Sequence, residues 1–227
     1  MNSFLDRSIK LLGEEKIASF KDKVILIAGL GGVGGTAFEA LLRSGFEKFV
    51  LIDFEKVDIS NLNRQILFNL DDVNKSKVEI AKKHALKINP NVQIETLEEK
   101  IDSSSFDEFE KHVDYVIDAI DYIPGKIALA KLSSKLNAHF ISSLGMGNRL
   151  NPEQVFITKL NKTENDPLAK KFRYECKING LDLSKINVVF SKETPIIKDK
   201  KPASMMMVPS TAGLLIARFV IEKVMEE

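Results

Sequence analysis

The sequence predicts an α/β fold, with a doubly wound, mainly parallel sheet of the Rossmann type and an irregular C-terminal extension. Two observations support this fold class. Apolar runs of strand length, rich in β-branched residues, alternate with segments of helical spacing. A glycine-rich turn joins the first of these runs to the first regular helix pattern. In open sheets of this class, ligands bind at the carboxyl ends of the strands.

The clearest unit is a strand, a helix and a second strand over residues 23–53. The run 23–29 is continuously apolar after its first residue, as in a strand buried on both faces of a parallel sheet. Glycines follow, then helical spacing as far as Ser44, where the next glycine is a stop signal, and then a strand over 49–53. The unit predicts a right-handed crossover between two parallel strands.

The alternation continues along the chain. We expect helices over 76–88, 123–136 and 211–227, and strands over 92–97, 114–120, 139–144, 154–160 and 186–191. A short helix opened by Asp166 and Pro167 is expected after the strand at 154–160. The polar stretch 192–207 contains lysines and prolines without periodicity, and we expect a mobile loop there.

The composition is that of an ordinary globular protein, 44% hydrophobic and 29% charged with a formal net charge of +1. It excludes fibrous and disordered classes, and a polyanionic partner would need a local basic patch. The single cysteine, Cys176, can form neither an internal disulfide nor a four-thiolate zinc cluster. Without an apolar stretch of about 18 residues or a signal-peptide pattern, we expect a cytoplasmic protein with no membrane segment.

A glycine-rich turn follows the first strand. Gly29, Gly31 and Gly34 have the G-x-G-x-x-G spacing, which lets backbone amides approach a phosphate at the positive end of a helix. Asp53 ends the second strand, where an acid can accept hydrogen bonds from ribose hydroxyls. Two alternatives stay open: the glycines serve only close packing while Asp53 caps a loop, or the site binds a nicotinamide dinucleotide.

A dense polar cluster follows the second strand and argues against a dehydrogenase. It contains Asn61, Arg64 and Gln65. An enzyme that cleaves a nucleoside triphosphate needs cations that stabilise the charge developing on the leaving pyrophosphate. Arg64 and Lys77 are the candidates, with Lys75 as the weaker alternative to Lys77. A solvated surface charge is the other interpretation for each of them.

Two aspartates lie near the end of the strand predicted over 114–120. Asp121 comes just past the strand, where a carboxylate faces the phosphates and can hold Mg²⁺. Capping of the next helix is the alternative role for Asp121. Asp118 lies two residues earlier on the same face, and we expect it to order the loop.

Together these segments resemble the ThiF/MoeB superfamily, whose fold also underlies the ubiquitin-activating enzymes. The resemblance rests, in chain order, on the glycine turn, Asp53, the segment 61–65, Lys77 and the segment 118–121. It implies a Rossmann-like ATP-binding fold that adenylates a carboxylate with MgATP. It also implies one adenylation domain over residues 1–227, with a nucleotide-binding core over about 20–145 and an extension over about 146–227.

The resemblance also implies roles for individual residues. The nucleotide would be bound by Gly29, Gly31 and Gly32 at phosphate, by Asp53 at the ribose, and by Asn61, Arg64, Gln65 and Lys77 around the phosphates. Asp121 would hold the magnesium. Arg64, Lys77 and Asp121 would carry the catalysis together with Arg7, which in relatives reaches into the nucleotide site of the partner subunit and so implies a homodimer. Gly35 departs from the serine of many members.

The second half of the sequence narrows the resemblance to one branch. The segments 143–152, 163–169 and 188–195, and the opening 7–13, look like the tRNA threonylcarbamoyladenosine dehydratases, called TcdA or CsdL. This branch implies a tRNA substrate, ATP and Mg²⁺ without zinc, and a cysteine desulfurase and sulfur-acceptor system as a further partner. The expected reaction is ATP-dependent cyclisation of threonylcarbamoyladenosine through carboxylate adenylation. The alternative is activation of the C-terminus of a ubiquitin-like sulfur-carrier protein.

A tRNA substrate needs basic contacts. The span 159–177 contains six Lys or Arg against three acids, and 192–201 contains four against two, so either can face phosphates or form a solvated charged face. Cys176 matches no catalytic-cysteine motif of the branch and is expected to be a non-catalytic thiol. The histidines stand singly and form no ligand set, at His84, His112 and His139.

Overall fold

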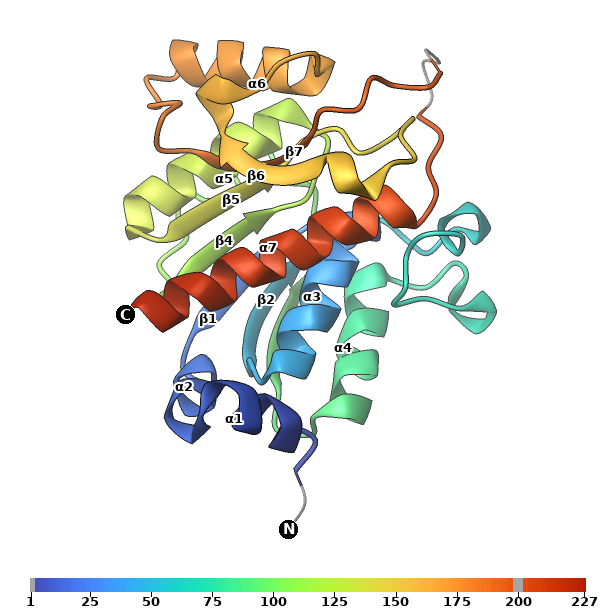
Figure 1. The fold of residues 1–227 in the computed structure, drawn as a ribbon, viewed down its shortest axis with the longest axis vertical. Helices are drawn as coiled ribbons and strands as arrows, with labels where there is room; N and C mark the ends of the chain where they lie inside the picture. The colour runs from blue at the N-terminus through green and yellow to red at the C-terminus, as the bar shows by residue number, and fades with distance from the viewer. Residues whose placement is uncertain (1–2, 198–201) are drawn as a thin grey trace.

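A computed structural model describes residues 3–197 and 202–227. The strands are β1 (Val24–Ala28), β2 (Lys48–Ile52), β3 (Gln93–Leu97), β4 (Tyr115–Asp118), β5 (His139–Ser143), β6 (Val155–Lys159) and β7 (Asn187–Ser191). They form a seven-stranded sheet in the order β3-β2-β1-β4-β5-β7-β6 (Figure 1). The neighbours are parallel except β6 and β7, which are antiparallel. The predicted doubly wound, mainly parallel fold is confirmed.

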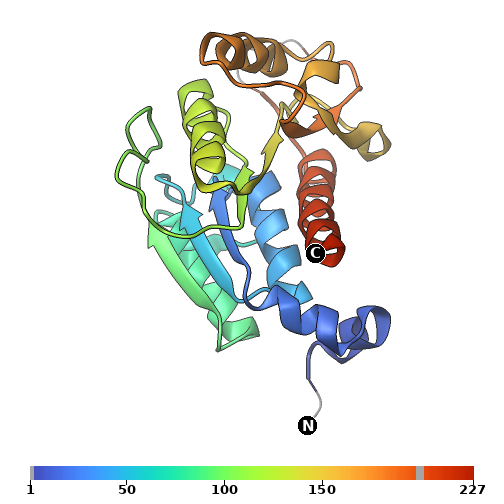
Figure 2. The same cartoon turned by 90° about the vertical axis from the view of Figure 1, so that its left-hand side faces the viewer.

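The helices cover both faces of this sheet. They are α1 (Asp6–Leu12), α2 (Glu14–Phe20), α3 (Gly32–Ser44), α4 (Lys77–Ile88), α5 (Ile123–Leu136), α6 (Pro167–Ile178) and α7 (Met207–Glu226). In the side view, α3 and α7 lie on one face of the sheet and α5 lies on the other, with α6 beside α5 (Figure 2). The part of the chain that the structure describes contains no helix with the length and apolarity needed to cross a membrane.

Each face of the sheet contributes to a separate apolar core. Along β1, Ile25 and Ile27 pack with α3, α4 and α7, while Leu26 and Ala28 pack with α5 and α6. Successive strand residues point to opposite faces, so a strand covered on both sides must be apolar throughout. This explains why the continuous apolar runs in the sequence predicted the strands so directly.

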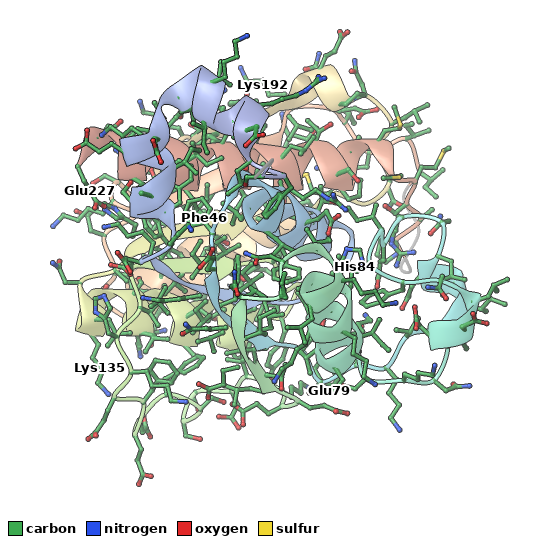
Figure 3. All side chains as sticks on the ribbon, turned by 90° about the horizontal axis from the view of Figure 1, so that it is seen from below. Phe46, Glu79, His84, Lys135, Lys192 and Glu227 are labelled. Carbon is green, nitrogen blue, oxygen red and sulfur yellow. The ribbon has the colours of Figure 1, made fainter. Side chains whose placement is uncertain are left out.

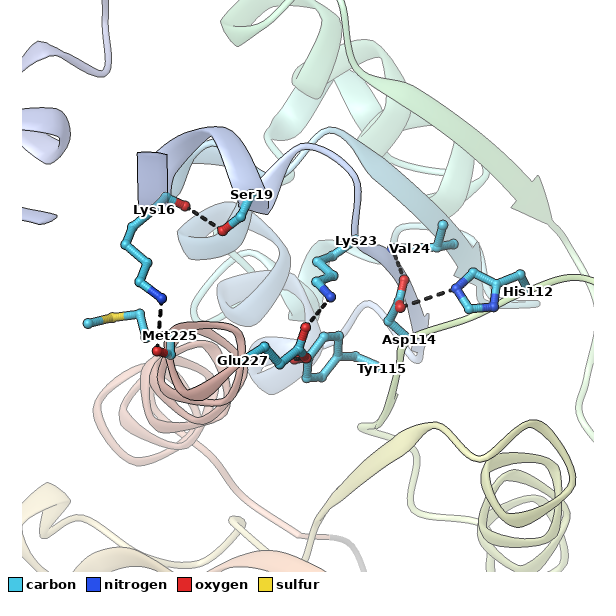
Figure 4. Close-up of polar contacts among 9 residues, drawn as sticks. All are labelled: Lys16, Ser19, Lys23, Val24, His112, Asp114, Tyr115, Met225 and Glu227. Atoms are coloured by element: carbon cyan, nitrogen blue, oxygen red, sulfur yellow. Dashed lines mark hydrogen bonds and ion pairs between the residues drawn. The ribbon is translucent and has the colours of Figure 1, made fainter. Parts of the chain in front are cut away.

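The C-terminal helix differs from its prediction. It begins at Met207 and not at residue 211, because Pro209 falls in the first turn, where the missing N–H removes no helical hydrogen bond. Gly213 allows α7 to approach α3 closely, since a Cβ there would lie 2.5 Å from the Val33 carbonyl oxygen. The residue that follows α7, Glu227, contacts the first residue of β4: Tyr115 Oη donates to Glu227 Oε1 at 3.0 Å (Figure 4).

The loop before α7 is anchored in its described parts. Asn148 donates from its backbone N–H to the Ala203 carbonyl and accepts from the Ile196 N–H, both at 2.7 Å. Residues 198–201 of the loop predicted to be mobile lie outside the described residues.

The three histidines have different side-chain neighbours, and His139 stacks on Tyr115 with 5.1 Å between the ring centroids. His84, labelled in Figure 3, lies on α4. Its Nε2 lies 2.6 Å from Oε2 of Glu39 on α3. His112 contacts Asp114 at 3.1 Å (Figure 4).

Candidate active site

A cleft of about 860 Å³ opens at the carboxyl edge of the sheet. It lies where the chain turns in opposite directions after the neighbouring strands β1 and β4, which is the usual ligand position in such sheets. The cleft is lined by Gly29, Gly31, Gly32, Asp53, Asn61, Arg64, Gln65, Lys77 and Asp121. The structure therefore brings together all the predicted site residues except Arg7.

The glycines of the turn have different reasons to be glycine. A Cβ on Gly34 would lie 1.8 Å from the Gly29 carbonyl oxygen, and Gly29 has a φ of +87° with its Cβ position 2.7 Å from the Ala119 carbonyl. Close packing therefore explains these two. Gly31 faces open space, with Gln65 Nε2 at 3.8 Å from its Cβ position as the nearest atom.

The amides available to a phosphate come late in the turn. The N–H of Gly29 donates to the Ile52 carbonyl at 2.8 Å, and that of Leu30 donates to Asp53 Oδ2 at 2.7 Å. The amides of Gly32, Val33 and Gly34 at the start of α3 have no carbonyl four residues earlier in the helix, whereas the Gly35 N–H already donates to the Gly31 carbonyl at 2.9 Å. The positive helix end and these amides form the anion-binding edge of the cleft.

Asp53 links the glycine turn to the next loop. Its Oδ2 accepts from Leu30 N, and its Oδ1 accepts from Glu55 N at 2.9 Å. Burial raises the pKa of Asp53 above its usual range, against the opposing effects of Lys77 and of the two amides. Asp53 thus caps the loop, which is the alternative role that the sequence left open for it. It also lines the cleft.

Arg64 stands at the mouth of the cleft after a short 3₁₀ turn, Ile59–Asn61. Asn61 closes this turn by accepting from the Asp58 N–H at 3.0 Å. Arg64 Nη1 donates to the Ser60 carbonyl at 2.8 Å and to Asn63 Oδ1 at 2.9 Å. These contacts hold the guanidinium in place and involve only one of its three nitrogens, so Nε and Nη2 remain donors for a phosphate.

Lys77 is the first residue of α4 and is 1% exposed. Its Nζ pairs with Glu55, whose side chain is 56% exposed. The surface-charge interpretation of Lys77 is therefore wrong. Lys75 is exposed and does not line the cleft, so Lys77 is the lysine that the fold places beside the anion-binding edge.

The two aspartates after β4 have separate environments. Asp118 is fully buried and pairs with Lys126 Nζ at 3.0 Å, while Ser142 Oγ donates to it at 2.7 Å. Its Oδ1 also accepts from the Ile120 N–H at 3.3 Å, which fits the expected ordering of the loop. Asp121 is exposed on the cleft and makes no capping hydrogen bond to α5, so its interpretation as a helix cap is wrong.

A second buried ion pair lines the cleft where the loop after β5 meets the start of α6. Arg149 and Asp166 lie 3.5 Å apart between Nη2 and Oδ2. Arg149 Nε donates to the Glu193 carbonyl at 3.0 Å, and Asp166 caps α6 by accepting from Ala169 N at 2.9 Å. The sequence predicted Asp166 only as the start of a helix, which the structure confirms, and gave Arg149 no role. The available signal was their place in the segments 143–152 and 163–169, which carry the resemblance to one branch.

Several buried polar atoms of the cleft lack a hydrogen-bond partner within the described residues. They are Gln65 Oε1, Arg149 Nη2 and Asp166 Oδ2. Arg149 Nη2 and Asp166 Oδ2 face each other in the ion pair at 3.5 Å, so of these described atoms the one left without any partner is Gln65 Oε1, at a cost of about 1–3 kcal/mol. A ligand that supplied hydrogen-bond partners would relieve this cost, so the cleft is built for a polar occupant.

Arg7 and Cys176 lie away from the cleft. Arg7 is exposed on α1, which covers the opposite edge of the sheet (Figure 1). Cys176 is buried beneath α6, and burial together with nearby Asp118 raises the pKa of its thiol to about 12. A protonated, sealed thiol is not a nucleophile.

A metal at this edge would be held by few protein atoms. Within residues 3–197 and 202–227, no three His, Cys, Asp or Glu side chains cluster as a metal cage. The exposed Asp121 carboxylate beside the anion-binding edge fits Mg²⁺, which takes one or two carboxylates together with phosphate oxygens and water.

Comparison with known proteins identifies the family. The model of the ThiF family matches residues 5–218. The chain belongs to the ThiF family. A tRNA threonylcarbamoyladenosine dehydratase of Bacillus subtilis is 34% identical to this chain. The alignment covers 95% of this chain and 92% of the Bacillus subtilis protein.

Solved structures give the same result. The Escherichia coli tRNA N6-threonylcarbamoyladenosine dehydratase TcdA in complex with AMP matches with a TM-score of 0.91 and 30% identity. Its complex with ATP matches with a TM-score of 0.90 and 31% identity. Both alignments cover 97% of this ThiF family chain and 93% of the other. The Rossmann-like fold class and the resemblance drawn from the sequence are confirmed.

Proposed function

We propose that this protein is an ATP-dependent tRNA threonylcarbamoyladenosine dehydratase. The observation that carries the proposal is the convergence of the predicted phosphate, ribose and metal residues in one cleft. The likeness of nearly the whole chain to dehydratases, one of them bound to ATP, supports it. The reaction adenylates the carboxylate of the threonyl group on tRNA and then closes a ring with net loss of water.

The cleft residues divide the work of binding ATP. The α3 amides near Gly31 and Gly32 bind phosphate oxygens, and Asp53 accepts from the ribose hydroxyls. Arg64 and Lys77 supply positive charge to the phosphates as pyrophosphate leaves. Lys77 can exchange its exposed partner Glu55 for a phosphate, since Glu55 regains water when released. Asp121 is the residue that would hold Mg²⁺, which neutralises charge on the leaving group.

The chemistry then needs no covalent protein intermediate. The threonyl carboxylate attacks the α-phosphorus of ATP, and the bond to the β-phosphate breaks with release of pyrophosphate. An atom of the neighbouring carbamoyl group attacks the acyl carbon, and AMP leaves with the former carboxylate oxygen as one proton is released. The protein contributes positioning and charge stabilisation, which suits a chain whose cysteine is sealed in the core.

A homodimer is part of the proposal. Arg7 cannot reach the cleft of its own chain, because α1 covers the opposite edge of the sheet. A partner subunit packed in antiparallel fashion would bring its own Arg7 toward this cleft. The proposal assigns Arg7 to phosphate binding in that partner's site.

The decisive experiment follows AMP and pyrophosphate release with Mg²⁺ and ATP. The additions are threonylcarbamoylated tRNA, the same tRNA without the modification, or a ubiquitin-like sulfur-carrier protein. We expect release only with the modified tRNA. Release that depended on the carrier protein would replace the proposal with a carrier adenylyltransferase.

A variant tests the assigned cation. Arg64→Ala should abolish release of AMP while the circular dichroism spectrum and melting temperature stay unchanged, because Arg64 contacts only local loop atoms. Full activity of this variant would remove Arg64 from the mechanism.

A further inference from the structure

A second cavity, of about 1040 Å³, lies between α5 and α6. We call it the α5–α6 groove. It shares Asp121, Tyr122 and Pro167 with the active-site cleft, so the two cavities adjoin each other. The helices α5 and α6 lie side by side on the face of the sheet opposite α3 and α7 (Figures 1 and 2). A chain lying in the groove could therefore place one residue in the active site.

The α6 wall of the groove is basic and aromatic. Tyr174 lies three residues after Lys171 and four after Lys170, so its side chain is next to both lysines on the groove side of the helix. The other face of α6 is buried through Ala169, Phe172 and Cys176. Tyr174 is 64% exposed, so it is a large aromatic surface that the fold itself does not use.

The α5 wall is mainly apolar. It consists of Ile123, Pro124, Ile127 and Ala128, with Lys131 at its end. Tyr122 stands where the groove meets the cleft and is 41% exposed. The Lys100 ammonium lies 4.7 Å from the centre of the Tyr122 ring, which adds positive charge at this junction.

The lysines of the groove have no competing partners. Across residues 3–197 and 202–227, no ion pair or side-chain hydrogen bond involves the ammonium groups of Lys131, Lys170 or Lys171. The acids in the lining are Asp121 and Glu175. Free lysines alternating with exposed aromatic rings over an apolar floor are typical of surfaces that bind single-stranded nucleic acid.

We propose that the α5–α6 groove holds single-stranded RNA of the tRNA substrate, next to the nucleoside that enters the active site. Bases stack on Tyr174 and Tyr122, and backbone phosphates contact Lys131, Lys170 and Lys171. The inference rests on the proposed function and adds to it the surface that receives the RNA. The competing hypothesis is that a protein partner occupies the groove, and the tests must distinguish a protein from RNA.

The first test is a charge reversal, Lys170→Glu with Lys171→Glu. The dissociation constant for tRNA is measured without ATP by fluorescence anisotropy at several KCl concentrations. Each lost phosphate contact lowers the slope of log affinity against log salt by about 0.7, so we expect a slope smaller by about 1.4 or more. The KM for tRNA should rise, while kcat at saturating tRNA and ATP affinity stay as in the wild type.

A matched control variant changes the net charge of the protein by the same amount at another place. Lys83→Glu with Lys87→Glu alters two exposed lysines on α4, on the other side of the sheet near His84 (Figure 3). This control should retain the wild-type salt slope.

The second test separates stacking from other roles of the tyrosine. Tyr174→Ala should weaken tRNA binding about tenfold, the expected loss of one stacked base. Tyr174→Phe should restore it, since the ring remains. The melting temperature should be the same in all three proteins because the side chain is exposed.

The outcomes distinguish the groove from the proposed function. If the wild type releases AMP with modified tRNA but the groove variants keep its tRNA affinity and salt slope, the groove proposal is overturned and the function stands. Loss of binding to a carrier protein, with tRNA affinity intact, also overturns it. Failure of the wild type to turn over modified tRNA would overturn the function, and the binding measurements would still decide whether RNA occupies the groove.

Discussion

Lys77 and Lys126 are equally buried, at 1% and 0% exposure, yet their surroundings differ. Lys126 Nζ donates to Asp118, to Ser142 Oγ at 3.1 Å and to the Ser143 carbonyl at 2.7 Å. All three donors of this ammonium are used. Among the described residues, Lys77 has one side-chain partner, Glu55, whose side chain is 56% exposed.

The difference shows which lysine can exchange its partner. Separating Lys126 from Asp118 would leave a fully buried carboxylate without its counter-charge, at a high desolvation cost. Separating Lys77 from Glu55 returns one carboxylate to water, and a phosphate in the cleft can take its place. Burial by itself therefore does not identify a functional lysine, whereas the exposure of its partner does.

The largest expected effect is on stability. Lys126→Met should lower the free energy of unfolding by about 3–5 kcal/mol, because Asp118 is left buried without its counter-charge. Urea denaturation followed by circular dichroism measures this loss.

The double variant Lys126→Met with Asp118→Asn is the matched control. It removes both charges and should recover a large part of the lost stability, as replacement of a buried pair usually does. A loss below about 1 kcal/mol in the single variant would mean that the pair is not a structural anchor.

The next effect is on catalysis. Lys77→Met keeps the shape of the side chain but removes the charge beside the phosphates, and we expect a loss of about 10²–10³-fold in the rate of pyrophosphate release. Stability should change by no more than about 1 kcal/mol, because the released Glu55 is solvated.

Glu55→Gln is the companion variant for Lys77. It removes the exchangeable partner and leaves the lysine, so activity should persist. If Lys77→Met destabilised the protein as strongly as Lys126→Met while turnover persisted, the roles of the two lysines would have to be reversed.

Local sequence signals account for the parts of the fold and of the site that could be predicted. Apolar β-branched runs and the glycine turn are local signals, and they predicted the sheet, the crossover and the anion-binding edge. Arg64 was found because a polar cluster next to a nucleotide turn has few structural uses, and Lys77 because it begins the next helix at the carboxyl edge of the sheet. The helix α1 was missed because it buries no residue, so its sequence carries no strong apolar stripe.

The buried ion pairs could not be predicted in the same way. Lys126 lies in an apolar helix, and nothing local indicates that its ammonium turns inward to a strand residue. Arg149 and Asp166 are 17 positions apart, and only the packing of the β5 loop against α6 brings them together. Such pairs are set by tertiary structure, whereas the residues proposed to bind phosphate lie in or next to turns whose chemistry is local.

The smallest effect is on the titration of Asp53, and it tests whether Lys77 faces the ribose site. Burial raises the pKa of Asp53, Lys77 opposes this, and Glu55 reinforces it. Lys77→Met should therefore move the pKa of Asp53 further upward and Glu55→Gln should move it downward, as measured by ¹³C carboxyl NMR.

Because the folded state binds the proton of Asp53 more tightly than the usual pKa of 3.8 implies, the free energy of unfolding falls as pH rises through the folded pKa. That fall should lie at higher pH in Lys77→Met, and it should vanish when Asp53→Asn is added. An unchanged Asp53 titration in both single variants would place Lys77 outside electrostatic reach of the Asp53 carboxylate.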